Sequence, residues 1–576
     1  MAKFEEYRKG HSPKQASNRM WPLYGAGIEN LGQDGKMIEK PMPAFGPDEL
    51  LVRHDACGLC FSDVKIIRLG QEHPRIYRSM QEDPVVMGHE VTMTVVGVGE
   101  NLCGQYQSGD RFILQADIFV NGVGYAYGYE IQGGLSEYNV IDQRILNGDH
   151  GNYLIPIKAD TGYAESALVE PWACVIAAYY LQYRTALKAG GIVWFIGPEN
   201  GREFSLSAGL DAEAHPAEIR LTQMDGPFGA WLRKRAAELD IPVKEIKDIV
   251  NEKEPANDNL ADDIILLDPT PDLIEEVSPY LTFHGMLVLA TQNMLARDVQ
   301  VDVGRIHYNR WLIIGGSGSD IAAIYRQARP NSKLKAGGKA LFVGAGGPMG
   351  RMHVQRAIEM KDGPAVVICS DVSDERLADL SATFGEEARQ KGINWISVNP
   401  TNQSEYEQRM APFKESGFDD IIMLAPIPAV ISDAAKWLAK EGVMNIFAGV
   451  ARGTSAALNL NETIFNDVHF IGSSASEIED MVHMLNDVES GSLSTNRSVA
   501  AIGSLEAVPA GLQAMMEARF PGKVVIFQQI KNLPLTGLPE LKEVLPSVYS
   551  KLKNGHEWTR AAEEELINLM LKDEEG

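Results

Sequence analysis

Cysteine is scarce in this sequence of 576 residues, and five residues of this type are spread along it: Cys57, Cys60, Cys103, Cys174 and Cys369. So few and so scattered cysteines exclude a disulfide framework. Cys57 and Cys60 form one C-x-x-C, a spacing typical of a redox pair or of half a structural zinc site. Because the sequence contains no second C-x-x-C, a four-cysteine zinc site is excluded.

Long apolar runs and an excess of basic residues are also missing. The first nine residues hold no apolar signal-peptide core, and no uninterrupted apolar run is long enough to span a bilayer. Lys plus Arg total 53 against 78 Asp plus Glu, which gives a net charge of −25. Such a surface repels nucleic acid and anionic membranes. We therefore expect a cytoplasmic protein without nucleic-acid or membrane partners.

Candidate metal ligands are present in three separate fragments. Cys60-Phe61-Ser62-Asp63 is followed after one loop by Gly88-His89-Glu90, and Glu170 comes later, before an apolar helical run. Catalytic zinc takes three protein ligands and keeps a fourth position open, so Cys60, His89 and Glu170 are the predicted set. The alternative interpretation is that the cysteine and the histidine are ordinary core residues. This interpretation does not account for three separate fragments that each offer a zinc ligand.

The order of these fragments, with Gly-Gly-Leu-Ser-Glu-Tyr at 133–138 between the last two, resembles the zinc-containing medium-chain alcohol and polyol dehydrogenases. It is most similar to the sorbitol dehydrogenase and L-sorbose-1-phosphate reductase branch. The resemblance implies a GroES-like β-barrel with one catalytic zinc ion. It also implies that Ser62 relays a proton, Asp63 orients His89 and Glu90 sits behind the metal. Since only Cys103 lies between the two glycine motifs, no structural zinc is expected.

A basic segment lies between the first two ligand candidates. Lys65, Arg75 and Arg78 stand there in an otherwise acidic protein, which predicts a site for an anionic group such as a substrate phosphate. A solvated basic loop is the alternative.

The chain repeats itself over its middle part. Lys-Ala-Gly-Gly precedes an apolar strand at 188–197 and again at 335–344, and Asp263 and Gly315 return as Asp420 and Gly472. Both offsets are equal, since 420 − 263 = 157 and 472 − 315 = 157. A constant register over two strands predicts two tandem Rossmann-like domains with doubly wound parallel sheets.

The expected fold class is therefore α/β plus β, in four segments. Residues 1–187 form the catalytic zinc domain, 188–333 a degenerate Rossmann-like domain and 334–510 an NAD-binding Rossmann domain. Residues 511–576 return to the catalytic domain and end in a helical extension, because 538–569 carries helical periodicity.

The second copy keeps a dinucleotide fingerprint. An apolar strand leads into a glycine-rich turn and a helix, so a helix N-terminus can approach a pyrophosphate. Asp371 follows the next strand, about twenty residues on, where it accepts from a ribose 2′-hydroxyl, and no Arg directly follows it; NAD is favoured over NADP. Gly344 or Ala345 fills the first turn position. The predicted cofactor residues are Gly344, Gly346, Gly347, Pro348, Met349, Gly350, Asp371 and Arg376.

The first copy lacks that fingerprint, because its turn at 197–203 loses the central glycine and carries Glu199 where phosphate would sit. Asp225 keeps a nucleotide site open as an alternative. Both copies retain an edge-strand candidate, 311–315 and 468–472. We expect these strands to pair within one chain, so that the first copy is a built-in dimer partner of the second; a homo-oligomer stays open.

These features predict a zinc- and NAD-dependent alcohol or polyol dehydrogenase (EC 1.1.1.-) that acts on a polyol, sugar or sugar phosphate. Two alternatives remain: a zinc-free quinone reductase on the same fold, and a non-enzymatic NAD-sensing scaffold. Both predict loss of the ligand trio, which the sequence retains.

Overall fold

The computed structural model describes residues 3–13, 17–198, 202–249, 252–473 and 475–571. It contains two compact units. Unit 1 comprises Met1–Ile176 and Ala475–Gly576, and unit 2 comprises Ala177–Ser474. Among the described residues, no helix combines the length and apolar composition that crossing a membrane requires.

Unit 1 is built on a sheet that, in the described residues, has eight strands in the order β11-β7-β6-β4-β27-β26-β28, with β10 paired to β4. These strands span Leu154–Pro156 (β11), Arg111–Leu114 (β7), Glu90–Val98 (β6), Leu50–Gly58 (β4), Lys523–Phe527 (β27), Val499–Ser504 (β26), Thr536–Gly537 (β28) and Tyr138–Ile141 (β10). Short antiparallel pairs join β1 (Ser17–Met20) to β3 (Ile38–Pro41), β2 (Pro22–Leu23) to β5 (Val85–Val86) and β8 (Phe119–Val120) to β9 (Val123–Gly124).

The helices of unit 1 are mostly short. They span Lys3–Arg8 (α1), Phe61–Leu69 (α2), Gln143–Leu146 (α3), Tyr163–Ala167 (α4), Val169–Ala177 (α5), Ile478–Ser490 (α15), Val508–Met516 (α16), Leu541–Val544 (α17), Pro546–Tyr549 (α18) and Arg560–Met570 (α19). The C-terminal helical extension is thus broken into three pieces. Its last helix docks within unit 1, where the Glu563 carboxylate accepts hydrogen bonds from the Tyr163 and Ala164 amides of α4.

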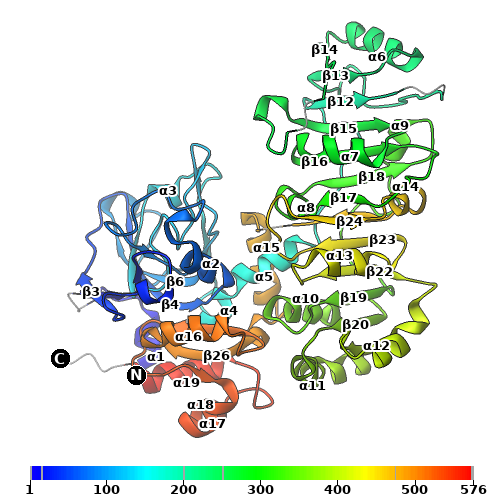
Figure 1. Cartoon of the computed structure of the whole chain (residues 1–576). Helices are drawn as coiled ribbons and strands as arrows, with labels where there is room; N and C mark the ends of the chain where they lie inside the picture. The colour runs from blue at the N-terminus through cyan, green and yellow to red at the C-terminus, as the bar shows by residue number, and fades with distance from the viewer. Residues whose placement is uncertain (1–2, 14–16, 199–201, 250–251, 474, 572–576) are drawn as a thin grey trace. The chain divides into compact units, whose positions relative to one another are not determined.

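Unit 2 contains one continuous sheet whose strands follow each other in a row from β14 to β21 (Figure 1). Its order is β14-β13-β12-β15-β16-β18-β25-β23-β22-β19-β20-β21. The strands of the first copy are β12 (Ile192–Ile196), β13 (Glu218–Thr222), β14 (Val243–Glu245), β15 (Ala261–Leu267), β16 (Leu281–Ala290) and β18 (Leu312–Gly316). Those of the second are β19 (Lys339–Val343), β20 (Val366–Ser370), β21 (Asn394–Val398), β22 (Phe418–Met423), β23 (Leu438–Ile446) and β25 (His469–Ile471).

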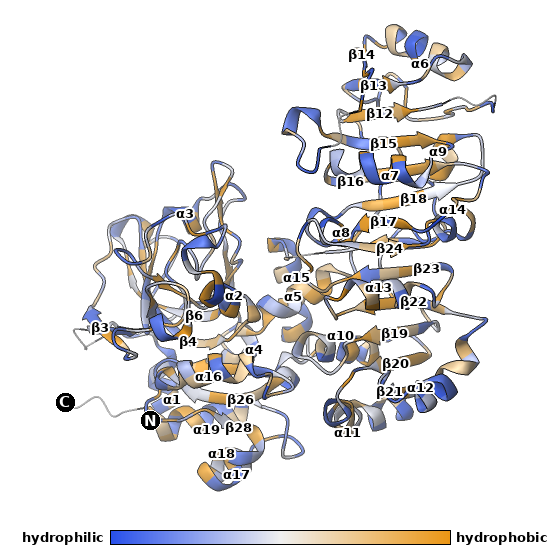
Figure 2. Ribbon diagram, in the orientation of Figure 1, coloured by the Kyte–Doolittle hydropathy of each residue, from blue (hydrophilic) through white to orange (hydrophobic). Residues whose placement is uncertain are grey.

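Each half of this sheet has parallel strands in the order 3-2-1-4-5-6, which is the doubly wound dinucleotide-binding topology. The helices of the first copy are α6 (Pro227–Glu238), α7 (Pro271–Val277), α8 (Val303–Asn309) and α9 (Ile321–Ile324). Those of the second are α10 (Pro348–Glu359), α11 (Asp374–Gln390), α12 (Gln403–Met410), α13 (Pro428–Ala435) and α14 (Asn461–Asn466). Figure 2 shows strands such as β15 and β22 as hydrophobic, as a sheet covered by helices requires. The predicted fold class is confirmed.

The two halves are joined by an antiparallel pair, β18 with β25, at Ile313 and Phe470. A second antiparallel pair joins β17 (Val299–Asp302) to β24 (Ser455–Leu458) and places Gln300 opposite Ala457. Both offsets equal that of the sequence repeat, since 470 − 313 = 157 and 457 − 300 = 157. Each of these residues therefore pairs with its own repeat counterpart, so a local two-fold axis relates the copies. The predicted intrachain strand pairing is present.

The limits of unit 1 differ from the expected ones. Unit 2 begins at Ala177 rather than near 188, and the chain returns to unit 1 at Ala475 rather than near 511. The reason for the early return is β26, which hydrogen-bonds to β27 and β28 in the sheet of unit 1. Residues 475–510 therefore belong with unit 1 by contact, although they follow the second repeat in sequence.

Candidate metal and cofactor sites

Three side chains that offer different donor atoms meet in unit 1. The Cys60 sulfur, a nitrogen of His89 and a carboxylate oxygen of Glu90 all lie within 4.8 Å of one another, and they form the one such group of three found among the described residues. His89 and Glu90 are buried, with 6% and 0% of their surface exposed. A soft thiolate, an imidazole and a carboxylate are the ligand types that zinc takes together.

Asp63 holds the two loops that carry these donors. Cys60 caps α2, and its backbone amide donates to Asp63 Oδ2 at 2.8 Å. The other oxygen, Oδ1, accepts from the Gly88 amide at 3.3 Å and lies 3.6 Å from His89 Nδ1. One fully buried carboxylate thus fixes Cys60 relative to His89. The predicted orienting role of Asp63 is consistent with these contacts.

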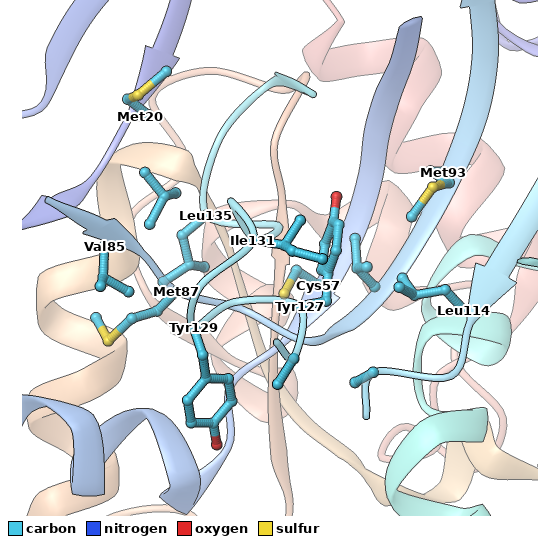
Figure 3. Close-up of a cluster of buried hydrophobic side chains, with 14 of the residues drawn as sticks. Met20, Cys57, Val85, Met87, Met93, Leu114, Tyr127, Tyr129, Ile131 and Leu135 are labelled. Carbon is cyan, nitrogen blue, oxygen red and sulfur yellow. The ribbon is translucent and has the colours of Figure 1, made fainter. Parts of the chain in front are cut away.

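Gly88 of the Gly-His-Glu motif and Gly134 of the Gly-Gly-Leu-Ser-Glu-Tyr motif make room for the thiol of Cys57. Gly88 has a φ of +98°, and a Cβ there would lie 2.9 Å from the Cys57 sulfur; a Cβ at Gly134 would lie 3.1 Å from the same atom. Cys57 is part of a buried hydrophobic cluster that also contains Tyr127 and Leu135 (Figure 3). Burial raises the pKa of its thiol well above the ordinary value. Cys57 is therefore a core residue, and the C-x-x-C is neither a redox pair nor a metal pair.

A buried ion pair joins Glu90 to Lys523, the first residue of β27. The Lys523 ammonium donates to Glu90 Oε1 and, at 3.2 Å, to the Leu59 carbonyl. Burial lowers the pKa of this lysine, but the negative charges of Glu90 and Cys60 outweigh it and raise the pKa. Glu90 Oε2 is buried and accepts no hydrogen bond. A buried carboxylate oxygen without a protein donor is a suitable metal ligand.

Glu170 lies beside this group without being part of it. It stands in the first turn of α5, and burial raises the pKa of its carboxyl to about 7 against the opposing effect of His89. We expected Glu170 as the third ligand and Glu90 behind the metal, whereas the structure brings Glu90 into the three-donor group. Ser62, the expected proton relay, is half-buried in the first turn of α2, two residues after the cap Cys60.

The donor group has the electrostatic character of a cation site. Burial alone would lower the pKa of His89, yet the negative charges of Cys60 and Asp63 raise it well above its ordinary value. The negative groups that favour a proton on this imidazole also favour a divalent cation. The orphaned oxygen of Glu90 and the mixed sulfur, nitrogen and oxygen donors therefore fit a zinc ion.

The basic segment is largely neutralised by the protein itself. Arg75 forms an ion pair with Asp117, and Arg78 lies 3.1 Å from Asp83 and 3.8 Å from Glu130. Within the described ranges, Lys65 has no carboxylate partner. Lys65 and Arg75 both act on the ring of His73. Burial lowers the pKa of His73 to about 4, and the positive charges of Arg75 and Lys65 contribute to this lowering.

His73 and Tyr129 connect this segment to the metal ligands, and sequence reasoning missed both. The Tyr129 ring lies 5.2 Å from the ring of His73 and 6.0 Å from that of His89. Lys523 was missed as well. The only signal for it was a lysine directly before the apolar run Val-Val-Ile-Phe, in a strand that is fully buried.

The cofactor turn of the second copy has the features that the fingerprint predicts. Gly344 has a φ of +86°, and a Cβ at Gly350 would lie 2.6 Å from the Ala345 carbonyl oxygen. Pro348 and Met349 open α10, which follows the turn directly. A Cβ at Gly347 would meet nothing within 4 Å, so the turn has open space there.

Asp371 is bound to the glycine turn. Its Oδ2 accepts from the Gly346 amide at 2.9 Å, and its Oδ1 accepts from the Ser373 amide at 3.0 Å. A Cβ at Gly346 would lie 2.6 Å from the Cβ of Arg376, so Arg376 also borders the turn. The turn, the Asp371 carboxylate and the Cβ of Arg376 thus lie together at the carboxyl ends of β19 and β20.

In the first copy, the chain itself occupies the corresponding edge. Arg202 donates to the carbonyls of Ser317 and Gly318, both at 2.7 Å, just beyond β18. Its guanidinium also lies 3.5 Å from Asp268, beyond β15. Glu199 lies outside the described residues, and Asp225 is exposed.

Comparisons with known proteins agree with this architecture. Residues 46–147 match the alcohol dehydrogenase GroES-like domain. The chain is 21% identical to mannitol-1-phosphate 5-dehydrogenase of Aliivibrio fischeri over 91% of this chain and 93% of that protein. It is 21% identical to L-sorbose 1-phosphate reductase of Klebsiella pneumoniae, again over 91% and 93%.

Among solved structures, 2R,3R-butanediol dehydrogenase of Bacillus subtilis superposes with a TM-score of 0.50 at 16% identity, over 88% of this chain and 99% of that one. At this identity the likeness shows the fold alone. The GroES-like match and the two relatives that cover most of both chains support a zinc-type medium-chain alcohol and polyol dehydrogenase family, and with it a nicotinamide-dependent oxidoreductase of the alcohol dehydrogenase type.

Proposed function

We propose that this protein transfers a hydride between NAD(H) and a secondary alcohol or ketone of a polyol, sugar or sugar phosphate, with one zinc ion at the substrate site. The observation that carries the proposal is the meeting of half-buried Cys60 with the buried side chains of His89 and Glu90. Two relatives of nearly the same extent are named for mannitol 1-phosphate and L-sorbose 1-phosphate, which supports the substrate class.

Cys60, His89 and Glu90 would hold the metal, and Glu170 would face it from α5. When bound, zinc supplies Lewis-acid polarisation of the substrate oxygen. Asp63 keeps the Cys60 and His89 loops together, and Lys523 holds one oxygen of Glu90 so that the other stays available. A pre-set ligand shell of this kind lowers the reorganisation needed during the reaction.

Oxidation of a secondary alcohol removes a hydride from carbon and a proton from oxygen. In our proposal the Ser62 hydroxyl accepts that proton and passes its own toward solvent, since Ser62 is half-buried and lies two residues past Cys60, which caps α2. The reverse transfer returns the proton when a ketone is reduced.

The cofactor belongs to the second copy. The glycine turn offers open space at Gly347, and Asp371 at the adjacent strand end would accept from the ribose hydroxyls, which favours NAD. The first copy would bind no dinucleotide, because Arg202 hydrogen-bonds across the matching edge. Its role would be that of a built-in dimer partner, which covers the edge strand β25 and spares an intersubunit contact.

For a phosphorylated substrate, Lys65 is the strongest candidate in the basic segment. Arg75 and Arg78 already have carboxylate partners, and a phosphate would have to compete with them. Phosphate recognition would then draw on Lys65 first and on Arg75 second.

The proposal is tested by an NAD- and NADP-coupled screen of polyols, sugars and sugar phosphates, run with and without a zinc chelator. We expect turnover of at least one polyol or sugar phosphate with NAD, lost with the chelator and restored by zinc. Quinone reduction that survives the chelator would support the zinc-free reductase instead.

A further inference from the structure

The local two-fold axis of unit 2 makes each residue of the second copy comparable with a counterpart in the first. Gly315 and Gly472 are such counterparts, and each is packed against a helix of the other copy. A Cβ at Gly315 would lie 2.9 Å from Ile464 Cγ1, and a Cβ at Gly472 would lie 2.6 Å from His307 Cα. Ile464 and His307 are themselves counterparts, since 464 − 307 = 157. The two packing sites thus correspond, but one holds isoleucine and the other histidine.

The histidine lies at the edge where a dinucleotide binds. Its Nδ1 donates to the carbonyl of Ile446, the last residue of β23, at 3.1 Å. In a 3-2-1-4-5-6 sheet, the strands on the side of the glycine turn bind the adenosine part of the dinucleotide. The strands β22, β23 and β25 of the second copy therefore lie on the side of the nicotinamide part. His307 is therefore a residue of the first copy that touches the nicotinamide half of the second.

Helix α8, which carries His307, also holds the loop after β23. The Asp302 carboxylate accepts from the Gly453 amide at 2.9 Å, and the Val303 amide donates to Thr454 at 3.1 Å. The Arg452 guanidinium donates to Asn309 at 2.9 Å. The backbone approach is close, because a Cβ at Gly304 would lie 2.2 Å from the Ala451 carbonyl oxygen.

An aromatic chain continues from His307 into the cofactor half. The His307 ring lies 6.4 Å from Phe447, which in turn lies 4.4 Å from His353 on α10. His353 is fully buried and bonded through Nδ1 to the Tyr179 hydroxyl at 2.6 Å. His307 thus connects the end of β23 with the helix that follows the glycine turn.

We propose that the first copy, although it lacks a dinucleotide fingerprint, completes the nicotinamide half of the cofactor site in the second copy. His307 is the positioning residue, because its hydrogen bond sets the end of β23 and its helix sets residues 447–454. The inference rests on the proposed cofactor site of the second copy. It adds that this site is built from both repeats of one chain.

Binding of two probes to the full-length protein separates the cofactor halves: NADH carries both, and ADP-ribose carries the adenosine half alone. In His307→Ile, which installs the residue of the symmetric position, we expect the Kd of NADH to rise about tenfold, the effect of one lost buried hydrogen bond. The Kd of ADP-ribose should stay within about twofold. His307→Asn, which keeps a donor near Nδ1, should recover most of the NADH affinity.

Ile464→Ala is the matched control, since it loosens the counterpart site at the other edge. It should lower the thermal midpoint without changing the Kd of NADH. Unchanged NADH binding in His307→Ile, or equal weakening of both probes, would overturn the inference and leave the cofactor site itself intact. Failure of the unmodified protein to bind either probe would overturn the cofactor assignment and, with it, this inference.

Discussion

Ile313 pairs across an antiparallel ladder with Phe470, the residue that holds the same place in the second repeat. Both are buried, with 2% and 1% of their surface exposed. The pair closes the edge strands of two parallel sheets against each other, and an edge strand left open is a site for unwanted association. A single chain thereby forms the kind of contact by which two identical sheets would dimerise.

Shortening Phe470 to alanine tests this junction. We expect a loss of about 3–5 kcal/mol in the free energy of unfolding, because a large buried ring is removed from the centre of the sheet. Ile313→Pro should be more severe, since it also removes a backbone donor. Denaturant titration gives the stability, and sedimentation gives the mass. A halved mass, or a loss of stability that depends on protein concentration, would show that the junction lies between chains instead.

The junction is also where sequence reasoning worked best. The offset of 157 residues came from short motifs, Asp-Asp-Ile-Ile and Ile-Gly, that lie on matching strands of the two copies. Because the same offset separates matching strands along the whole repeat, it predicts that both copies have the same strand order. The domain limits were not predictable in the same way, because β26 belongs to the sheet of unit 1 through pairing with β27 and β28.

The metal site shows why the rest needed a structure. Cys60 and His89 stand in recognisable motifs, but whether Glu90 or Glu170 completes the group depends on side-chain direction, which spacing does not give. Lys523, which holds Glu90, is 433 residues away along the chain. Nothing local in the sequence joins these two charges.

Zinc content separates the two carboxylates. We expect Cys60→Ser, His89→Ala and Glu90→Gln to reduce bound zinc to well below one ion per chain and to abolish turnover, because each removes a donor. Glu170→Gln should keep the zinc and lower activity, since Glu170 lies outside the three-donor group. Cys103→Ser, at an exposed free cysteine, is the control. Zinc retained in Glu90→Gln and lost in Glu170→Gln would restore Glu170 as the ligand.

Acid should destabilise the protein through His54. This side chain is fully buried, donates from Nδ1 to the Ser136 carbonyl and accepts at Nε2 from the Tyr127 hydroxyl. Burial lowers its pKa to about 4 against 6.5 in the unfolded chain. The folded state therefore binds fewer protons, and its stability is complete above pH 6.5 and falls as the pH drops toward 4.

The expected loss is about 3 kcal/mol, from a shift of about 2.5 pKa units. Urea titrations at pH 7, 5.5 and 4.5 follow most of this loss, which is complete only below pH 4. In His54→Gln, the decrease in the free energy of unfolding with falling pH should be smaller by this amount. The buried His353, whose pKa is also lowered, should still contribute its own decrease. Identical pH profiles for the two proteins would refute the assignment to His54.

Cofactor choice should depend on Asp371 and not on Asp225. Asp371→Ala removes the carboxylate beside the glycine turn, so we expect the Kd of NAD to rise about tenfold and discrimination against NADP to weaken. Asp225→Ala should change neither, since Arg202 hydrogen-bonds across the matching edge of the first copy. Fluorescence titration with NADH and NADPH measures both. Equal losses in the two variants would mean that the first copy binds cofactor too.

The buried pair of Lys523 and Glu90 should be energetically coupled. Lys523→Met leaves a carboxylate buried without its partner, which costs about 3–5 kcal/mol in the free energy of unfolding. Glu90→Gln leaves the ammonium unpaired and costs a similar amount. In the double variant neither charge is stranded, so the loss should be smaller than either single loss, and a double-mutant cycle measures the difference.

Metal provides a second test of the same pair. A bound divalent ion would compensate the charge of Glu90 in place of the ammonium, so Lys523→Met should lose less stability in zinc-saturated protein than after chelation. Lys523→Arg should retain most of the stability in both states, because it keeps the positive charge. If zinc leaves the stability of Lys523→Met unchanged, Glu90 does not face the metal, and its free oxygen Oε2 has only a structural role.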